Sequence, residues 1–424
     1  MDIVIVGLGY IGLPTAIMFA NYGQNVIGVD KDTNVIDSLC RGEIHLEEPG
    51  LQEAFTRALN KGNFKAQDKM THGDVFIIAV PTPNNFDLHK SCDLSYVHSA
   101  VKTIIPYLRE GNTIIIESTI SPGSTEEIVS KEIENAGFIV GKNIHLVHCP
   151  ERVLPGQILH ELKCNDRIIG GVTEACTKKG MTIYKSFVEG ELIPANASVA
   201  ELSKLAENTF RDVNIALANE FVKVGYRLGI DALKVIDIAN KHPRVNIHAP
   251  GPGVGGHCLA VDPYFIVSKA PHETPIIQAS RAINSEMPLF IVNITKQIMS
   301  NYNGRKITIL GVTYKGNVDD IRESPALEIL EMLKEETDYD ISVFDPHVKR
   351  SWIETNFQHA IEESDLLLLL TDHDEFKHFD ARQLKTMRQP IVFDTKNIIS
   401  ELSGVTLFNL GNIFTTKKII EESK

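Results

Sequence analysis

The 424-residue sequence lacks the features expected of a membrane-embedded, secreted or nucleic-acid-binding protein. No run of about 18 uninterrupted apolar residues occurs, so no membrane-spanning helix is predicted. The apolar N-terminus has neither a basic start nor a small-residue cleavage site, and therefore does not resemble a signal peptide. Basic residues are a minority, with 42 Lys and Arg against 55 Asp and Glu and a net charge of −13. A basic surface for nucleic acid or anionic lipid is not indicated, and we expect a cytoplasmic protein.

Cysteine is also scarce, and its spacing excludes two further classes of protein. The six cysteines form no CxxC pair, so neither a structural zinc motif nor a dithiol redox motif is indicated. Six are too few for a disulfide framework in a chain of this length. Any chemistry at cysteine is therefore expected to involve a single thiol.

What the sequence does contain is an alternation of short apolar runs with helical segments. Ile3–Val6, Val26–Asp30, Val75–Val80 and Thr113–Glu117 are apolar and β-branched nearly throughout, with helical composition between the first two. Strands of this kind, interleaved with helices, are typical of a parallel sheet that is covered on both faces.

The middle of the chain has a different pattern, and the last third returns to the first one. Ser198–Leu228 is rich in Ala, Leu, Val and Glu and has no Gly or Pro before Gly225, which predicts one long helix. Ile307–Gly311 and Ile341–Asp345 are again apolar strands separated by a helical segment. We predict an α/β protein with two Rossmann-like, doubly wound domains joined by a central helical region, with bounds 1–195, 196–300 and 301–424.

The turn after the first strand fits a dinucleotide-binding motif. Gly7, Gly9 and Gly12 have G-x-G-x-x-G spacing between a strand and a helix, which allows a tight turn, close approach to a pyrophosphate and close helix packing. Asp30 ends the second strand, where a carboxylate accepts hydrogen bonds from a ribose and repels a 2′-phosphate. The motif therefore favours NAD over NADP as cofactor. Pro81–Pro83 and Glu117–Thr119 end later strands and are expected at the same edge.

A glycine-rich loop, Pro250–Cys258, is the most informative stretch. Four glycines in six residues allow close approach of backbone to a ligand, and Cys258 at the end of the loop is placed to act as a nucleophile. Beside a nicotinamide, a thiol allows an aldehyde to be oxidised further through a thiohemiacetal and a thioester. The alternative is a small buried hydrophobic cysteine.

Polar residues elsewhere are candidates for the same site. Three of them lie at i, i+4 and i+7 on the long helix and share one face, where they either meet a ligand or form a solvated stripe; these are Lys204, Asn208 and Arg211. Glu151 follows a strand and is either a general base or a surface carboxylate. Near the glycine loop, His242, Arg244 and His248 favour substrate contacts, since no carboxylate completes a metal site, and no metal is expected. Lys315 and Arg322 suit a pyrophosphate or a solvated loop.

Four motifs in this order resemble the UDP-glucose/GDP-mannose dehydrogenase family over essentially the whole chain. They are VGLGYIGLP, ENTFRDVNIALANE, GPGVGGHC and GVTYKGNVDDIRESP. The resemblance implies a NAD domain, a central helical dimerisation region and a UDP-binding domain. It also implies a dimer in which the position of Arg244 reaches the partner subunit.

The resemblance further implies roles for individual residues. Cys258 would be the nucleophile, Lys204 and Asn208 would stabilise the oxygen on the reacting carbon, Asp262 would assist, and Glu151 with Thr119 would handle proton and water chemistry. The implied cofactor contacts are Tyr10, Ile11, Asp30, Thr82, Thr119 and Arg322. The implied substrate contacts are Arg152, Val153, Lys204, Asn208, Arg211, His242, Arg244, Gly255, Tyr314 and Lys315.

Two segments indicate the substrate within the family. Leu259–Pro263 and Arg152–Gly156 differ from the UDP-glucose enzymes and resemble UDP-N-acetyl-D-mannosamine dehydrogenases. This implies a four-electron oxidation of UDP-N-acetyl-D-mannosamine with two NAD, for capsular or other surface polysaccharides. The alternatives are the same chemistry on UDP-glucose, UDP-N-acetylglucosamine or GDP-mannose, a two-electron dehydrogenase with a structural Cys258, and a binding module without turnover. A redox pairing of Cys258 with Cys92 is a separate hypothesis.

Overall fold

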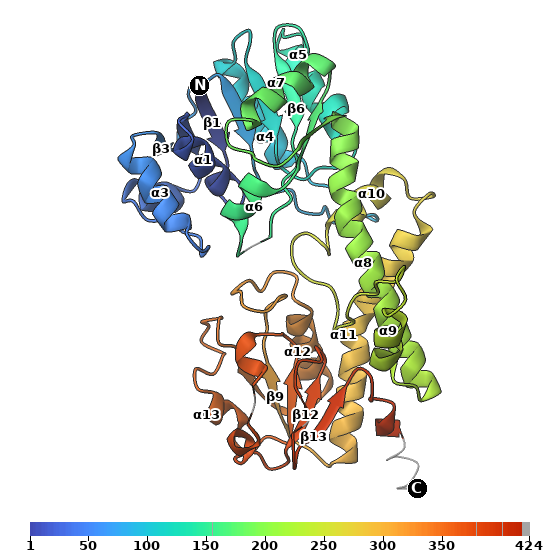
Figure 1. The fold of residues 1–424 in the computed structure, drawn as a ribbon. Coiled ribbons are helices and arrows are strands. Elements are labelled where there is room, and N and C mark those ends of the chain that lie inside the picture. The colour runs from blue at the N-terminus through green and yellow to red at the C-terminus, as the bar shows by residue number, and fades with distance from the viewer. Residues whose placement is uncertain (155, 379, 401, 418–424) are drawn as a thin grey trace. The chain divides into compact units, whose positions relative to one another are not determined.

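The computed structural model describes residues 1–417 apart from 155, 379 and 401, and divides into two compact units (Figure 1). Unit 1 contains residues 1–207 and 264–271, and unit 2 contains residues 208–263 and 272–424. No helix among the described residues is long and apolar enough to cross a membrane. Each unit has its own sheet and core.

The described part of unit 1 contains an eight-stranded sheet with strand order β3-β2-β1-β4-β5-β6-β7-β8. The first six positions follow the Rossmann order, with its reversal between β1 and β4. The strands are β1 (Asp2–Val6), β2 (Asn25–Val29), β3 (Phe64–Gln67), β4 (Val75–Ile78), β5 (Thr113–Ile116), β6 (His145–His148), β7 (Arg167–Gly171) and β8 (Leu192–Asn196). The helices are α1 (Gly12–Asn21), α2 (Thr33–Cys40), α3 (Leu51–Asn60), α4 (Ser95–Ile104), α5 (Ser130–Asn135), α6 (Ile158–Cys164) and α7 (Glu174–Tyr184), with short turns η1 (Ile105–Tyr107) and η2 (Thr125–Val129).

One strand pair of this sheet departs from the predicted parallel arrangement. β6 and β7 are antiparallel, with Val147 opposite Gly171 and His148 opposite Gly170. The connection between them, residues 149–166, therefore starts and ends at the same edge of the sheet. As a result Arg167, the first residue of β7, lies at the carboxyl edge of β5 and β6, whereas a parallel strand would begin at the opposite edge.

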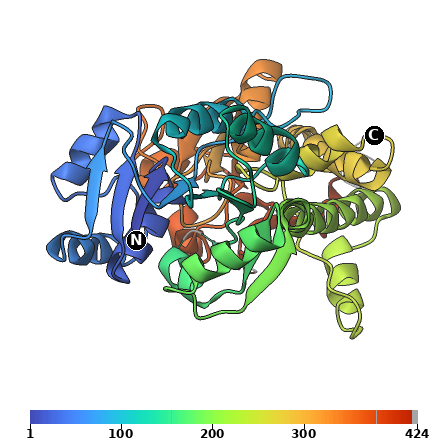
Figure 2. The same cartoon turned by 90° about the horizontal axis from the view of Figure 1, so that it is seen from above.

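Helices cover both faces of this sheet (Figures 1 and 2). On one face Ile5, Ile77 and Ile115 pack in a core with Leu13 and Phe19 of α1. Neighbouring strand residues point to the opposite face, as the two-residue period of a strand requires. Because both faces are covered, β4 is apolar in every position, and β1 and β5 are apolar after their first residue, as the sequence predicted.

Unit 2 is built around a five-stranded parallel sheet with order β10-β9-β11-β12-β13. This is the other common doubly wound order, with its reversal between β9 and β11. Its strands are β9 (Lys306–Leu310), β10 (Asp340–Phe344), β11 (Leu366–Leu369), β12 (Ile391–Asp394) and β13 (Thr406–Asn409). The helices that accompany them are α11 (Pro275–Asn301), α12 (Pro325–Glu336) and α13 (Phe357–Ile361), with turns η3 (Asp374–Phe376) and η4 (Ala381–Leu384). Together the two sheets and the long helix confirm the predicted fold class.

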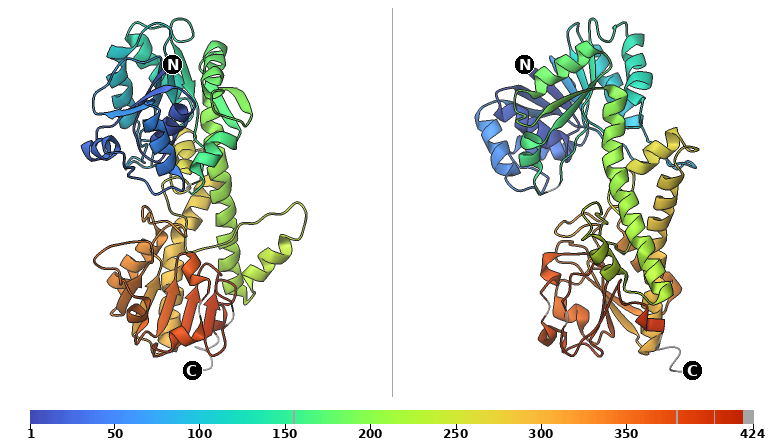
Figure 3. Two further views of the ribbon diagram at one scale, coloured as in Figure 1. Left: turned by 60° about the vertical axis from the view of Figure 1, so that its left-hand side comes forward. Right: turned by 45° about the vertical axis from the view of Figure 1, so that its right-hand side comes forward.

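The helical middle of the chain consists mainly of α8 (Ala197–Leu228), with α9 (Ala232–Ala239) and α10 (Asp262–Lys269). α8 has 32 residues, matching the predicted long helix, and its part in unit 2 lies beside α11 (Figure 3). A buried ion pair joins these two helices, because Arg281 Nη1 lies 2.6 Å from Asp212 Oδ1. Asn284 donates to the same carboxylate at 2.8 Å and accepts from Asn219 at 2.9 Å. A polar network therefore fixes the register of α8 against α11.

The glycine turn after β1 is required by close backbone contacts. Gly7 has φ +93°, and a Cβ there would lie 2.5 Å from the Ala79 carbonyl oxygen. A Cβ on Gly12 would lie 1.9 Å from the Gly7 carbonyl oxygen, whereas nothing lies within 4 Å of one built on Gly9. Gly7 and Gly12 thus allow the turn itself, and Gly9 leaves open space beside it.

Loss of the buried cation between α8 and α11 should destabilise the protein strongly. Arg281→Met leaves the buried Asp212 carboxyl group without its cation, and we expect a loss of about 3–5 kcal/mol in unfolding free energy. Lys223→Met is the matched control, since it breaks an exposed pair with Glu286 between the same helices and should cost about 0–1 kcal/mol. Urea unfolding measures both. Equal losses for the two variants would show that the buried pair does not stabilise the fold.

The two glycines of the turn should respond differently to alanine. Gly12→Ala forces the helix away from β1 and should cost about 3 kcal/mol or more in unfolding free energy. Gly9→Ala should leave the unfolding free energy within about 0.5 kcal/mol of the wild type but weaken NAD binding by about tenfold, roughly 1.4 kcal/mol. Thermal unfolding and titration calorimetry separate the two effects. Equal NAD affinity of Gly9→Ala and wild type would contradict the predicted role of this glycine.

Candidate active site

The dinucleotide motif and its acidic partner come together at the reversal point of the first sheet. Asp30 Oδ2 accepts a hydrogen bond from the backbone N–H of Leu8 at 2.8 Å, and Oδ1 accepts from Asp32 N–H at 2.9 Å. Asp30 is only partly buried, while Gly9 is exposed. The carboxylate is therefore held beside the glycine turn with lone pairs left for a ribose hydroxyl.

Two threonines predicted at this edge are also brought together. The Thr82 hydroxyl donates to the Thr119 carbonyl oxygen at 2.6 Å. Ser118 Oγ accepts from the Val80 backbone N–H at 2.9 Å and so joins the loops after β4 and β5. Tyr10 and Ile11, at the start of α1, are partly buried. These residues all lie at the carboxyl edge, where ligands of doubly wound sheets bind.

Glu151 lies in a buried ionic cluster and not on the surface. Its Oε2 forms a short hydrogen-bonded ion pair with Arg167 Nη2, and its Oε1 accepts from the Arg152 backbone N–H at 2.6 Å. The same Arg167 nitrogen lies 3.2 Å from Glu117 Oε1. The three side chains are at most 8% exposed. This excludes the alternative of a surface carboxylate at Glu151.

The neighbours of this cluster are uncharged. Burial raises the pKa of the Cys149 thiol to about 12, so the thiol sulfur accepts from Arg167 Nε at 3.1 Å in its protonated form. Burial lowers the pKa of His148 to about 3, which makes the imidazole neutral at pH 7. Arg167 therefore neutralises charge only on Glu117 and Glu151.

Arg152 and Val153 follow on the same loop. Arg152 Nε pairs with Glu207 Oε1 of α8 at 3.0 Å, and Val153 packs against the core of unit 1. Pro155, within the predicted Arg152–Gly156 segment, lies outside the described residues. Arg152 is partly exposed, and its paired guanidinium can exchange Glu207 for an anionic ligand.

The glycine-rich loop before Cys258 packs tightly on the loop that follows β9. A Cβ on Gly255 would lie 2.3 Å from the Glu323 carbonyl oxygen, and one on Gly256 would lie 2.7 Å from the Tyr314 ring. The loop is anchored at its start, where Gly251 N–H donates to Asn219 Oδ1 at 2.9 Å. The glycines therefore serve close packing of this chain's own backbone as well as any contact with a ligand.

Cys258 stands at the turn into α10, next to a buried polar pair. The Cys258 carbonyl oxygen accepts from the N–H groups of Val261 and Asp262 at 3.0 and 2.8 Å. Asp262 is buried and accepts at Oδ2 from Asn208 Nδ2 at 2.6 Å. The structure thus links Cys258 to two of the predicted catalytic residues, Asp262 and Asn208, within unit 2.

The three polar residues that were predicted to share one face of α8 differ in how far they are exposed. Asn208 is buried, Lys204 one turn earlier is partly buried, and Arg211 is exposed. Two apolar side chains of the helix are accessible in the single chain, with Phe210 60% and Leu217 41% exposed. Lys204 and Asn208 still share one face through their four-residue spacing.

The histidine loop is mostly accessible. His242 and Arg244 are exposed, with a weak contact of 3.4 Å between the Arg244 N–H and His242 Nδ1. His248 is partly buried, and its backbone N–H donates to Asn214 Oδ1 on α8 at 2.9 Å. Burial, followed by the charge of Arg211, lowers the pKa of His248 and disfavours its cationic form.

The loop after β9 presents the remaining predicted residues. Lys315 is exposed, and Tyr314 is partly buried against the glycine loop. Arg322 is also exposed and forms a close pair with Asp320, at 2.6 Å from Nη2 to Oδ2. Its Nη2 lies 3.2 Å from His257 Nδ1, so Arg322 borders the residue before Cys258.

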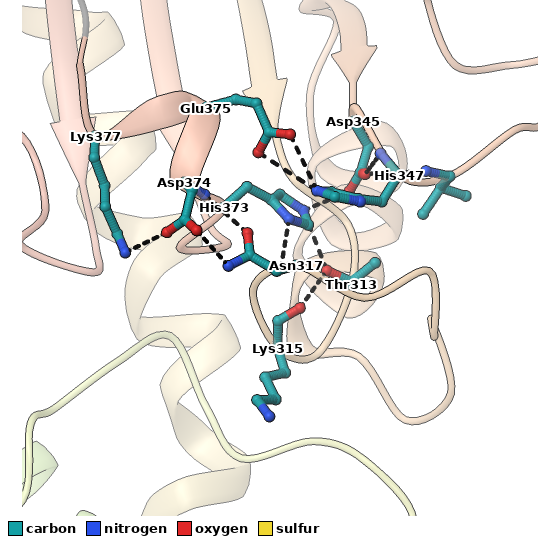
Figure 4. Close-up of polar contacts among 10 residues, drawn as sticks. Thr313, Lys315, Asn317, Asp345, His347, His373, Asp374, Glu375 and Lys377 are labelled. Carbon is teal, nitrogen blue, oxygen red and sulfur yellow. Dashed lines mark hydrogen bonds and ion pairs between the residues drawn. The ribbon is translucent and has the colours of Figure 1, made fainter. Parts of the chain in front are cut away.

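A buried Asp–His pair supports the base of that loop (Figure 4). Asp345 Oδ2 accepts from Val312 N–H at 2.7 Å and lies 3.1 Å from His373 Nε2. His373 Nδ1 accepts from the Asn317 N–H at 3.0 Å, so Nε2 carries the proton and donates to Asp345. Figure 4 shows the Lys315 side chain extending away from this group. The pair therefore fixes residues 312–317 and leaves Lys315 available to a ligand.

His373 also lies near His347 and Glu375, a group whose ligand atoms are within 4.8 Å of one another. Three such residues can form a metal site. Here both ring nitrogens of His373 are already used, one as acceptor and one as donor. We therefore assign the group a structural role in unit 2.

Sequence reasoning missed Arg167 and Tyr184, which surround the Glu117 and Glu151 carboxylates. The Tyr184 hydroxyl donates to Glu117 Oε1 at 2.6 Å, and its ring lies 4.5 Å from the Arg167 guanidinium. A signal was present, because a charged residue opening the apolar run Arg167–Gly171 requires a buried partner.

Comparison with family models covers most of the chain. Residues 1–188 match the NAD binding domain of the UDP-glucose/GDP-mannose dehydrogenase family, residues 198–286 its central domain, and residues 308–401 its UDP binding domain. The chain therefore contains the NAD binding domain that the glycine motif predicted.

Individual relatives agree with this result over nearly their whole length. A UDP-N-acetyl-D-mannosamine dehydrogenase of Methanococcus vannielii is 44% identical, with 97% of each chain covered. The native structure of the UDP-N-acetyl-mannosamine dehydrogenase Cap5O of Staphylococcus aureus is 52% identical with a TM-score of 0.93, covering 98% of this chain and 100% of that one. The UDP-D-ManNAc dehydrogenase of Pyrococcus horikoshii is 40% identical with a TM-score of 0.93 and the same coverage. This chain belongs to the UDP-glucose/GDP-mannose dehydrogenase family.

Proposed function

We propose that this chain oxidises the C6 alcohol of UDP-N-acetyl-D-mannosamine to the carboxylate, using two NAD and one water. The observation that carries the proposal is Cys258 at the turn into α10, adjacent to the buried Asp262–Asn208 pair. The activity named for the relatives, at 40–52% identity over almost the full chain, supports the choice of sugar. The product would supply an acidic sugar for capsular or other surface polysaccharides.

The residues at the reversal point of the first sheet fit NAD. Gly9 leaves room for a pyrophosphate, the start of α1 offers backbone N–H groups, and Asp30 retains lone pairs for a ribose. Tyr10, Ile11, Thr82, Thr119 and Arg322 are the further proposed contacts. When bound, NAD accepts a hydride from the reacting carbon.

The second oxidation is proposed to proceed through a covalent bond between Cys258 and the substrate. After the first hydride leaves, the Cys258 thiolate adds to the aldehyde carbon, and loss of a second hydride converts the thiohemiacetal to a thioester. Lys204 and Asn208 are proposed to stabilise the oxygen of the reacting carbon. Asp262 assists by fixing the Asn208 amide, since it accepts from Nδ2 at 2.6 Å.

Hydrolysis completes the reaction. Water adds to the thioester carbon, its proton goes to Glu151, and the C–S bond breaks to release the carboxylate and the Cys258 thiolate. Thr119 is proposed to assist in this step. Hydrogen bonds on both oxygens fix the orientation of the Glu151 carboxylate. The nucleotide sugar is proposed to contact Arg152, Val153, Lys204, Asn208, Arg211, His242, Arg244, Gly255, Tyr314 and Lys315.

We also propose that the protein is a homodimer, which is a separate question from its chemistry. Phe210, Leu217 and Val224 repeat every seven residues along α8 and are 41–60% exposed, and Leu228 extends the row at 65%. An apolar seam with this period is typical of a helix that packs against another helix. A second copy of α8 would bury this seam, and Arg244 is proposed to reach the partner's site.

The number of NADH formed per sugar and the effect of replacing Cys258 together test the proposed reaction. Purified protein should form two NADH for each UDP-N-acetyl-D-mannosamine consumed, followed by absorbance and by mass spectrometry of the uronate. Cys258→Ser should reduce formation of the acid by about 10³-fold or more, because a hydroxyl does not replace the thiolate. UDP-glucose, UDP-N-acetylglucosamine and GDP-mannose serve as the comparison panel. One NADH per sugar, or preference for another sugar, would reject the proposal as stated.

Charges placed in the apolar seam should separate the dimer. Leu217→Lys with Val224→Lys puts two cations into the proposed contact, so sedimentation should show monomers where the wild type shows dimers. Lys223→Met, on the side of α8 that faces Glu286, is the control and should remain dimeric. Dimers in both variants, with unchanged dissociation on dilution, would place the contact elsewhere.

A further inference from the structure

Arg167 is the centre of a hydrogen-bonded group that the proposed reaction does not yet use. Its Nη2 contacts Glu151 Oε2 and Glu117 Oε1, its Nε donates to the Cys149 sulfur, and its guanidinium lies over the Tyr184 ring. Glu117 has two more donors, the Tyr184 hydroxyl at 2.6 Å and the Thr15 hydroxyl at 3.2 Å. The group is therefore held from α1, α7 and the ends of β5 and β6.

The charges in this group do not balance. Two carboxylates, Glu117 and Glu151, share one guanidinium, while Cys149 and Tyr184 are neutral because burial raises the pKa of both groups. Two ionised carboxylates beside one cation leave a net negative charge out of contact with water, which is expensive. One proton on Glu117 removes this charge.

Glu151 needs a fixed orientation to serve as a base. The contact with Arg167 holds one carboxylate oxygen, and the Arg152 N–H holds the other at 2.6 Å. The side chain is only 8% exposed, so its orientation depends on neighbours at the start of β7 and on its own loop.

We propose that Arg167 is a positioning residue that orients Glu151 for thioester hydrolysis, and that Glu117 competes with Glu151 for the same guanidinium. The inference rests on the proposed function, because it assigns the cluster to the hydrolysis step. It predicts that the cluster acts on this step and not on the hydride transfers that precede it.

The buried Glu117 carboxylate gives this arrangement a pH dependence. Burial raises the pKa of Glu117 to about 7, although Arg167 lowers it in part. Below that pH Glu117 is neutral and Arg167 pairs with Glu151 alone. Above it Glu117 is ionised and competes for the guanidinium, so Glu151 shares less of that charge and interacts more strongly with the attacking water. Hydrolysis should therefore accelerate as the pH rises through about 7.

Rapid-quench experiments on the full-length protein separate the steps. The first NADH reports alcohol oxidation, and mass spectrometry of the intact protein reports the thioester on Cys258. Glu117→Gln keeps the shape of the side chain but cannot ionise, so the rise near pH 7 should disappear and hydrolysis above it should slow by about three- to tenfold. Arg167→Lys retains one charge but not the guanidinium fork, and hydrolysis should slow by about 10- to 100-fold with accumulation of the thioester.

Three comparisons make the outcome decisive. In both variants the first NADH should form within about twofold of the wild-type rate. Lys163→Met, which breaks an exposed pair with Glu189 in the same unit, should leave every step unchanged.

Glu151→Gln should trap the thioester. If neither this variant nor the wild type ever carries an acyl group on Cys258, the proposed function itself fails. If Glu151→Gln traps the thioester but Glu117→Gln hydrolyses it with the wild-type rate and pH profile, the role of the cluster is wrong. Because Glu117→Gln is isosteric, it remains informative even if Arg167→Lys does not fold.

Discussion

One buried guanidinium, that of Arg167, joins the ends of three neighbouring strands in the first sheet. Glu117 follows β5, Glu151 follows β6, and Arg167 opens β7. Removal of these charges from water is costly, and the cost is offset only where the hydrogen bonds are complete. The fork of Arg167 reaches Glu151, Glu117 and the Cys149 sulfur together, which an ammonium group cannot do. The antiparallel direction of β7 places the cation at the edge where both carboxylates lie.

The two doubly wound sheets use the same acidic position for different purposes. Asp30 follows β2 and Asp345 follows β10, and each accepts from the backbone of the turn after the neighbouring first strand. Each Asp30 oxygen accepts one backbone N–H, and the residue is partly exposed. Asp345 is buried, with His373 and the N–H groups of His347 and Val348 as additional partners. The first carboxylate is therefore available to a ribose, whereas the second is an internal support for the loop that carries Lys315.

Much of this fold follows from local sequence patterns, which explains what could be predicted. The long helix, the glycine turn, Asp30 and most strand positions depend on residues close together in the chain, and the structure has them within a few residues of the prediction. The position of Thr82 and Thr119 at one edge also followed, since parallel strands share that edge. The direction of β7 could not be predicted, because an apolar run such as Arg167–Gly171 does not indicate whether the strand is parallel or antiparallel to its neighbour. The Arg167 cluster combines residues from Thr15 to Tyr184, and such long-range pairing is not encoded in spacing. The exposure of Phe210 could not be predicted either, because apolar composition alone does not distinguish a core from an interface.

The difference in accessibility between Asp30 and Asp345 has a kinetic consequence for the proposed reaction. With only one of the two carboxylates available to a ribose, both coenzyme molecules must use the same position in succession. The spent molecule has to depart and a fresh one has to enter while the sugar remains in place. An aldehyde left unattached during that interval would be able to diffuse away. Attachment to sulfur prevents this escape, so the lifetime of the covalent adduct must exceed the time of coenzyme exchange.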